Sequence, residues 1–243
     1  MSDSTNPNRT VTLMNNAQST VDAPNALTAK RTANSPIDAV VFDMDGVLVD
    51  ARDWHYEALN QALATVGLHI NRAEHLTTYD GLSTKQKLRM LTLEHGLPES
   101  LHGFLNDLKQ RYTMQIVAAS CHPVFEHEYL LSSLKRAGFK VAVASNSIYA
   151  SVDAIMSRAE LLGYFDVVLS NQDVASPKPA PDIYLAAASR LGTTPERCLV
   201  VEDNENGIRA ATAAGTELLT VSNPDDVNWQ RIATRLAQLG ALQ

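Results

Sequence analysis

Short apolar runs alternate with helical patterns along most of the chain. The runs are mostly apolar without strict alternation, as expected for parallel strands that helices cover on both faces. The five runs are Ala39–Phe42, Val141–Ala144, Val167–Leu169, Leu199–Val201 and Leu218–Val221. The repeated strand–helix–strand order predicts an α/β fold with a doubly wound parallel sheet.

Helical segments separate these runs. They are predicted at Phe125–Ala137, Ile148–Leu162, Pro181–Leu191 and Gly207–Ala214, and an amphipathic helix over Asp225–Leu239 closes the chain. A glycine follows four of the helical patterns, where a left-handed residue commonly ends a helix. These glycines are Gly138, Gly163, Gly192 and Gly215.

One long interval has no strand pattern. From Ala51 to Cys121 the sequence is helical, most clearly over Trp54–Val66, Thr84–His95 and Leu101–Ala118. An insertion of this length is too large for a loop. We therefore divide the chain into a core, residues 37–50 and 122–243, and an inserted α-helical cap domain, residues 51–121.

The first 36 residues differ from the rest of the chain. They are rich in Ser, Thr, Asn, Ala and Pro and lack the apolar centre of a signal peptide. This composition predicts a disordered N-terminal tail over residues 1–36.

Composition narrows the function classes. The 243 residues are 45% hydrophobic and 19% charged, which is typical of a soluble globular protein. A net charge of −7 argues against nucleic-acid and anionic-membrane partners. Cys121 and Cys198 cannot form a disulfide framework and favour a reducing compartment, so we expect a cytoplasmic protein. We also expect a monomer or weak homodimer.

Two carboxylates, Asp43 and Asp45, follow the first apolar run. Like charges this close are costly unless a cation or a shared proton relieves them, although a plain polar strand end is the simpler alternative. In a parallel sheet, ligands bind beyond the carboxyl ends of the strands. Residues that follow the other predicted strands therefore decide between these interpretations.

Polar residues follow two further strands. Ser145-Asn146-Ser147 comes after the second and Glu202-Asp203 after the fourth, while Lys178 lies in a proline-rich loop between the third and fourth. Carboxylate oxygens are the ligands that Mg²⁺ prefers. The predicted Mg²⁺ ligands are Asp43, Asp45, Glu202 and Asp203.

The same residues suit a phosphate ester as substrate. Ser145 and Asn146, where a helix begins, form a predicted phosphate site together with the fixed positive charge of Lys178. The Asp43 carboxylate can attack phosphorus to give an aspartyl-phosphate. Asp45 can then protonate the leaving oxygen and later deprotonate the attacking water.

This arrangement resembles the haloacid dehalogenase superfamily over about residues 37–223. The matching motifs are Asp43-Met44-Asp45-Gly46-Val47-Leu48-Val49-Asp50, Ser145-Asn146-Ser147, Lys178-Pro179-Ala180-Pro181-Asp182 and Glu202-Asp203-Asn204-Glu205-Asn206-Gly207. The resemblance implies a Rossmann-like core, a mobile helical cap, and Mg²⁺-dependent phosphoryl transfer through Asp43. The insertion looks like the cap of the subgroup that contains β-phosphoglucomutase, phosphoglycolate phosphatase and sugar-phosphate phosphatases.

Details within the motifs favour a phosphatase acting on a small phosphorylated metabolite, such as a sugar phosphate. Dehalogenase and phosphonatase relatives lack an aspartate at the position of Asp45. Thr84 and Ala51 depart from the mutase pattern, which leaves a phosphoglucomutase-like transferase as the alternative. A non-catalytic binding protein has no use for the acid at Asp45.

Two cap residues are predicted to contact the substrate. His55 matches a histidine that is frequent in the subgroup, and Lys85 follows a cap loop that resembles the one entering the active site. Lys87 and Arg89 are interpreted as a solvated helix face. The histidines lack the spacing of a zinc site.

Overall fold

Five parallel strands form one sheet at the centre of the core. The structure, a computed structural model, describes residues 23–243. The strands are β1 (Ala39–Phe42), β2 (Lys140–Ala144), β3 (Val167–Leu169), β4 (Cys198–Glu202) and β5 (Glu217–Thr220), in the order β3-β2-β1-β4-β5. The predicted doubly wound α/β fold is confirmed, and each predicted strand lies within one residue of its observed bounds.

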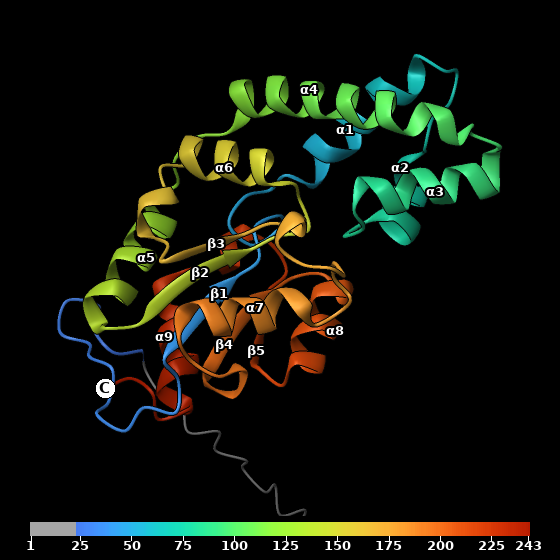
Figure 1. Ribbon diagram of the computed structural model, residues 1–243. Helices are drawn as coiled ribbons and strands as arrows, with labels where there is room; N and C mark the ends of the chain where they lie inside the picture. Colours follow the sequence, from blue (N-terminus) through green and yellow to red (C-terminus); the bar gives the residue numbers. More distant parts are fainter. Residues whose placement is uncertain (1–22) are drawn as a thin grey trace, which may run out of the picture.

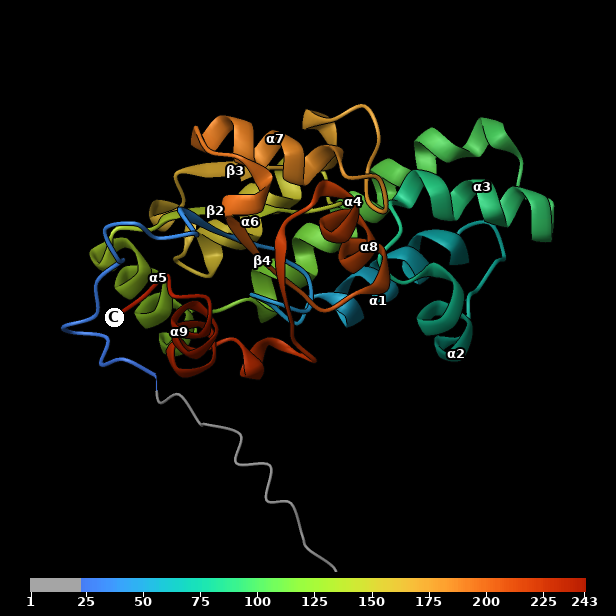
Figure 2. The same cartoon turned by 90° about the horizontal axis from the view of Figure 1, so that it is seen from below.

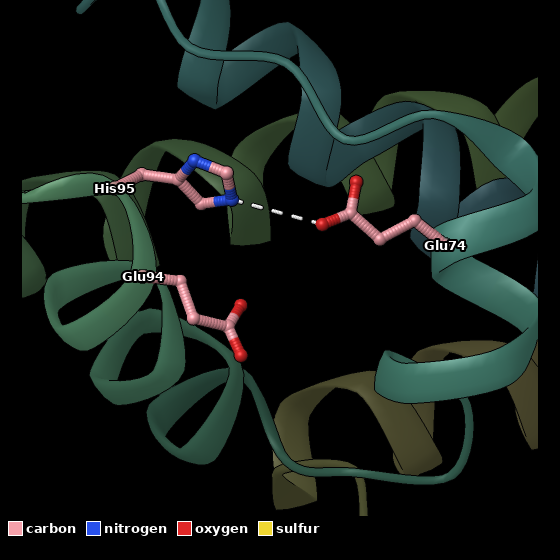
Figure 3. Close-up of side chains that lie close together, drawn as sticks. All are labelled: Glu74, Glu94 and His95. Atoms are coloured by element: carbon pink, nitrogen blue, oxygen red, sulfur yellow. Dashed lines mark ion pairs between the residues drawn. The ribbon is translucent and has the colours of Figure 1, made fainter.

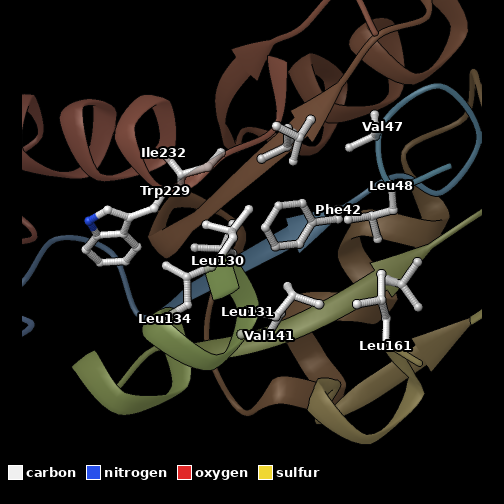
Figure 4. Close-up of a cluster of buried hydrophobic side chains, with 14 of the residues drawn as sticks. Phe42, Val47, Leu48, Leu130, Leu131, Leu134, Val141, Leu161, Trp229 and Ile232 are labelled. Atoms are coloured by element: carbon white, nitrogen blue, oxygen red, sulfur yellow. The ribbon is translucent and has the colours of Figure 1, made fainter. Parts of the chain in front are cut away.

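Helices cover both faces of the sheet, giving three layers (Figure 2). The core helices are α5 (Phe125–Ala137), α6 (Tyr149–Arg158), α7 (Asp182–Leu191), α8 (Glu205–Ala214) and α9 (Trp229–Gln238). Successive strand residues point to opposite faces. Val40 and Phe42 pack with α5, α6 and α9, whereas Ala39 and Val41 pack with α7 and α8. Figure 4 shows Phe42 among side chains of α5 and α9.

Three of the four predicted glycine caps are confirmed. Gly138, Gly192 and Gly215 end α5, α7 and α8 with positive φ. The prediction for Gly163 is wrong, because α6 ends at Arg158 and the left-handed residue after it is Glu160, with φ of 59°. Gly163 lies instead in the third of the six short helical turns that residues 23–243 contain. These turns are the π-helical His75–Tyr79, Glu99–Leu101, Leu162–Tyr164, Asn171–Asp173, Pro195–Arg197 and Pro224–Asp226.

The segment between β1 and α5 forms a helical body beside the sheet (Figure 1). Its helices are α1 (Arg52–Ala64), α2 (Arg72–Glu74), α3 (Thr84–His95) and α4 (His102–Ser120). Leu59, Leu63, Leu88, Leu91 and Leu105 gather in a hydrophobic cluster of their own. Because this body has its own core, the helical insertion is structurally distinct from the sheet layers, while the exact domain boundaries stay a prediction.

Residues 23–36 pack against the core. The indole of Trp229 donates a hydrogen bond to the Pro24 carbonyl (2.8 Å), and Ala26 and Ala29 are buried. Lys30 and Gln243 exchange two backbone hydrogen bonds. The predicted disorder is therefore wrong for residues 23–36, because these contacts supply burial that composition did not reveal; residues 1–22 lie outside the described residues. Among residues 23–243, no helix combines the length and apolarity needed to span a bilayer.

Candidate active site

Asp43 stands at the point where the sheet reverses its strand order. It follows β1, the central strand, and its N–H donates to the Val201 carbonyl (3.0 Å) on β4. From β1 the chain builds β2 and β3 on one side, and later β4 and β5 on the other. Such a switch point opens a crevice at the carboxyl edge of the sheet.

Lys178 joins Asp43 to Glu202. Its Nζ donates to Asp43 Oδ1 (2.6 Å), Glu202 Oε1 (2.6 Å) and the Ala144 carbonyl (2.9 Å). All three side chains are buried. This lysine therefore has a fully satisfied ammonium group whose position is set by the ends of three strands.

Glu202 has its own set of partners. The Tyr184 hydroxyl donates to Oε1 (2.6 Å), and the N–H groups of Asp203 and Asn204 donate to Oε2. Gly207 makes room for this carboxylate, because a Cβ there would lie 1.7 Å from Oε1. Both Glu202 oxygens are thus occupied, so this residue orders the loop after β4 and holds Lys178.

Asp43, Glu202 and Asp203 bring carboxylate oxygens within 4.8 Å of one another. Asp203 Oδ1 is buried without a hydrogen-bond partner among residues 23–243. Burial, reinforced by Glu202, raises the pKa of Asp203 to about 7. Burial also raises the pKa of Asp43 well above its ordinary value, against the opposing effect of Lys178.

These observations fit a magnesium ion. The donors are hard oxygens, one of them buried and unpaired, and a divalent cation would remove the cost of crowding three acids. Gly46, with φ of 86°, lets the backbone approach this cluster, since a Cβ there would lie 2.1 Å from Asp203 Oδ2. Asp43 and Asp203 have oxygens to spare for a metal, with Glu202 behind them.

Asp45 lies in a different environment from Asp43. Its Oδ1 is 3.2 Å from His55 Nε2, and its Oδ2 accepts a hydrogen bond from the Ser147 hydroxyl (3.2 Å). Both oxygens are therefore occupied away from the acid cluster. The structure does not support the predicted metal-ligand role of the Asp45 carboxylate.

His55 connects Asp45 to a buried lysine. Lys109 Nζ lies 3.1 Å from His55 Nδ1. An ammonium group only donates, so Nδ1 accepts and Nε2 carries the proton that points to Asp45. Burial by itself would raise the pKa of Asp45, but His55 and Lys109 outweigh it and keep that pKa below its ordinary value.

The predicted phosphate-binding residues lie beside Lys178, but their side chains are already bonded within the protein. Asn146 Nδ2 donates to the carbonyls of Gly81 (3.0 Å) and Lys178 (3.2 Å), while its Oδ1 accepts from the Lys178 N–H (3.0 Å). The Ser145 hydroxyl accepts from the Ser147 N–H (3.0 Å) and is fully buried. Asn146 thus braces two loops, and the Ser145 hydroxyl keeps its proton to donate.

The structure corrects the interpretation of Lys87, whereas the substrate contact of Lys85 stays a prediction. Both lysines line the same cavity as Asp43, but Lys85 is exposed and Lys87 is buried with 7% exposure, not on a solvated face. A capping box between Ser83 and Gln86 fixes the start of α3. Residues two apart on a helix face opposite sides, so Lys85 and Arg89 share the solvent face and Lys87 points inward with Leu88 and Leu91.

A cavity of about 530 Å³ lies between the sheet edge and the cap. Its wall combines acids and cations from both bodies. From the core come Asp43, Asp45, Ser147, Lys178 and Asp203, and from the helical body come His55, His75, Lys87, Lys109 and Gln110. Nearly all the chemistry-bearing residues predicted from the sequence therefore meet in one chamber, although Ser145 stays behind its wall.

Direct contacts hold the helical body over this cavity. Asn204 Nδ2 donates to Asp80 Oδ2 (3.3 Å), and the Asn146–Gly81 bond lies beside it. On another side, Gln110 Nε2 donates to the Ser151 hydroxyl (2.9 Å), which donates back to Gln110 Oε1 (3.1 Å). These bonds join the cap to the core around the acids.

A second group of metal-type side chains lies at the far end of the helical body (Figure 3). It consists of Glu74, Glu94 and His95, which are partly or fully exposed. His95 Nε2 lies 3.6 Å from Glu74 Oε1, and Glu94 Oε2 accepts from the Tyr79 hydroxyl (2.6 Å). Pairing within the protein accounts for this group.

Sequence reasoning missed Lys109 and Tyr184. Lys109 carried a signal, because Leu105, Thr113 and Val117 stand on the same face of α4 at four-residue spacing and are all buried. A lysine inside such a stripe needs a partner. Tyr184 carried no signal, since a tyrosine on the apolar face of α7 is also what core packing produces.

The fold and the site together define a doubly wound α/β core in which a helical cap covers a carboxylate- and lysine-lined cavity. The chain matches the family model described as haloacid dehalogenase-like hydrolase over residues 40–221. It belongs to this family, and it is an enzyme of this class. The predicted superfamily membership is confirmed.

The chain is similar to named relatives along most of its length. The chain is 30% identical to protein CbbY of Cereibacter sphaeroides over 226 residues, covering 85% of this chain and 95% of that relative. It is 29% identical to phosphoglycolate phosphatase of Aquifex aeolicus over 178 residues, covering 73% and 81%. A crystal structure of CbbY from Rhodobacter sphaeroides in complex with phosphate matches with a TM-score of 0.68 and 28% identity, covering 76% of this chain and 85% of that one.

Proposed function

We propose that the protein is a Mg²⁺-dependent phosphatase that hydrolyses a small phosphorylated metabolite, such as a sugar phosphate, through an aspartyl-phosphate on Asp43. The observation that carries this proposal is the placement of Asp43 and Asp45 on one cavity wall with different partners. Within residues 23–243, side chains donate a hydrogen bond to only one of the two Asp43 oxygens: Oδ1 accepts from Lys178. This leaves Oδ2 for attack. Relatives named for phosphate ester hydrolysis, and one that binds phosphate, support the same chemistry.

In the first step, an Asp43 oxygen forms a bond to phosphorus while the bond from phosphorus to the ester oxygen breaks. The leaving oxygen takes a proton from Asp45, and the alcohol departs. Asp45 must be protonated for this step although His55 and Lys109 lower its pKa. An approaching phosphate dianion opposes that lowering, because a second negative charge nearby favours the protonated carboxyl.

In the second step, a water molecule attacks phosphorus and gives a proton to the Asp45 carboxylate. The bond between phosphorus and the Asp43 oxygen breaks, which releases inorganic phosphate and restores both acids. The low pKa of Asp45 suits this step, in which it acts as a base. Lys178 keeps Asp43 in place throughout and offsets the charge on the phosphoryl oxygens.

The magnesium ion would be held by Asp43 and Asp203, with Glu202 supporting them from behind. When bound, such an ion polarises the phosphoryl group and offsets its negative charge.

The cap would limit the access of water to the reacting groups. Hydrogen bonds between cap and core, including the one from Gln110 to Ser151, hold the cap over the cavity.

The test is a phosphatase screen over a metabolite library with and without Mg²⁺. Asp43→Asn is expected to lower turnover by about 10³-fold or more, because the amide is a poor nucleophile. Asp107→Asn is a matched control, since Asp107 is exposed on α4 and outside the cavity wall. Normal turnover by Asp43→Asn would remove the nucleophile assignment.

Glucose 1,6-bisphosphate added in parallel separates the phosphatase from the phosphoglucomutase-like alternative. A transferase needs such an activator to load Asp43, whereas a phosphatase does not. Hydrolysis that proceeds unchanged without the activator supports the phosphatase.

A further inference from the structure

Lys87 is a buried cation without a partner. It lies in the first turns of α3, is 7% exposed and forms part of the cavity wall. Within residues 23–243, no hydrogen bond or ion pair engages its Nζ, unlike the fully bonded Nζ of Lys178. Burying an ammonium group without a counter-ion is costly, so this position calls for an anion from outside the protein.

A second buried lysine adds to this positive charge. Lys109, on α4, is also 7% exposed and lines the same cavity. Burial, and then the nearby charge of Lys87, lower the pKa of Lys109 to about 7. Two cations that repel each other inside one cavity would both be stabilised by an anion near them.

His75 provides an independent observation on the same wall. Its side chain is 2% exposed, and neither ring nitrogen has a hydrogen-bond partner among residues 23–243. The Tyr56 ring lies against it, with centroids 5.0 Å apart. Burial lowers the pKa of His75 to about 4, so at neutral pH the ring is uncharged and offers one N–H donor.

These groups face the leaving-group side of the cavity. Lys178 bonds Asp43, where the phosphoryl group would be transferred, whereas the carboxylates whose charges act on Lys87 are Asp80 and Asp45. Asp45 is the residue proposed to protonate the leaving oxygen. A group bound by Lys87 would therefore belong to the alcohol part of the ester.

We propose that Lys87 and His75 bind a second anionic group of the substrate, so that the enzyme prefers phosphate esters whose alcohol carries a carboxylate or a second phosphate. This inference rests on the proposed phosphatase function, which makes the bound ester a substrate. Binding of the anion itself does not depend on turnover. An ester with a neutral alcohol would fill the cavity and leave Lys87 uncompensated.

Binding measurements test the proposal on the full chain carrying Asp43→Asn, so that no ligand is consumed. Calorimetry compares 2-phosphoglycolate with 2-hydroxyethyl phosphate, and ribulose 1,5-bisphosphate with ribulose 5-phosphate, in the presence of Mg²⁺. The first pair tests a carboxylate and the second pair a second phosphate. We expect the more anionic member of at least one pair to bind about tenfold more tightly or better, as a charge-assisted hydrogen bond provides.

Lys87→Met added to this protein should remove that preference, with little change for the less anionic member. His75→Phe should weaken the same ligand by about threefold to tenfold. Lys87→Arg should restore part of the preference. Arg89→Met is the matched control, because it removes a cation from the exposed face of the same helix.

The proposal fails if Lys87→Met affects both members of each pair equally, or if neither pair shows a preference. The melting temperature of Lys87→Met should not fall, since no internal bond is lost. Should that variant fold poorly, Lys87→Gln gives the same comparison. If the protein prefers the more anionic ligands but the parent enzyme hydrolyses no ester, the anion site is supported and the proposed phosphatase function is wrong.

Discussion

Lys178 and Asp43 form a buried ion pair in which Nζ and Oδ1 are 2.6 Å apart, at the ends of segments separated by 135 residues. Glu202 accepts from the same ammonium group at the same distance. One cation thus holds two carboxylates that would otherwise repel each other. The pair is therefore both part of the reaction chamber and a tie between the strand ends.

Lys178→Met should destabilise the protein by about 3–5 kcal/mol, because it leaves two buried carboxylates without their cation. A surface pair provides the contrast. Lys135 and Asp166 are 2.5 Å apart but more than one third exposed, so Lys135→Met should cost only about 0–1 kcal/mol. Urea unfolding of both variants measures the difference, and similar losses would mean that burial does not govern the Lys178 pair.

Asp45→Asn should affect esters according to their leaving groups. An alkyl phosphate needs a proton on its leaving oxygen, so its turnover should fall by about 10²–10⁴-fold. For p-nitrophenyl phosphate, whose phenolate departs unprotonated, the loss in the first step should be much smaller. Single-turnover rates on both esters check this, and equal losses would contradict the acid role.

His55→Asn should reproduce part of the Asp45 effect. His55 positions Asp45 and does not itself replace the acid, so we expect a smaller loss of about tenfold to a hundredfold on alkyl phosphates. The pH profile should also shift upward, because the pKa of Asp45, which must be protonated in the first step and ionised in the second, loses the lowering effect of His55. An unchanged pH profile would show that His55 only packs there.

Mg²⁺ should raise the melting temperature of the protein even without substrate. At a concentration of 100 times its dissociation constant, a ligand specific for the folded state adds about 2.7 kcal/mol. Asp203→Asn should abolish this rise, because it removes the negative charge of the carboxylate whose buried Oδ1 has no partner among residues 23–243. Glu94→Gln, in the exposed group of Figure 3, should leave the rise intact; the opposite pattern would locate the metal at the surface.

Binding of the more anionic ligands should depend on pH through Lys87. Burial lowers its pKa to about 8, with Asp80 and Asp45 opposing that change and Lys109 and His75 nearby. Only the protonated amine attracts an anion, so affinity should fall as the pH rises above about 8, by up to about tenfold per pH unit. At pH 8, binding should take up about half a proton, since the free amine is half protonated and the bound one fully so.

Calorimetry in buffers of different ionisation enthalpy measures this uptake. Lys109, with a pKa of about 7, titrates over a neighbouring range, so the contribution of Lys87 is the part that Lys87→Met removes. A proton uptake that is the same in both proteins would assign the pH dependence to another group.

The core of the fold was readable from the sequence because its strands are buried on both faces. Residues of β1 and β4 alternate between two hydrophobic clusters, so both sets must be apolar and the runs stand out from the helices. The acids that follow β1 and β4 were predictable for the same reason, since parallel strands bring their carboxyl ends to one edge.

The cap side was harder to predict, because helix faces are set by where each helix begins. The Ser83 capping box fixes the start of α3, and with it the face on which Lys87 is buried while Lys85 stays exposed. Lys85, Lys87 and Arg89 follow one another at two-residue spacing, and this spacing does not indicate which side chain is buried. The role of the Asp45 side chain likewise depended on His55, which is ten residues away, and on Ser147, which is 102 residues away and reaches Asp45 only in the folded chain.

The contacts of residues 24–32 have a practical consequence. Arg31 bridges to Leu242 and pairs with Asp38, directly before β1, so the C-terminus is secured at the edge of the sheet where β1 begins. The acids that follow β1 and β4 stand at the other edge. A purification tag or fluorescent protein fused after Gln243 would therefore project from the side of the enzyme opposite the acids and leave the cavity unobstructed. Deleting residues 1–32 would instead expose Trp229 and promote aggregation.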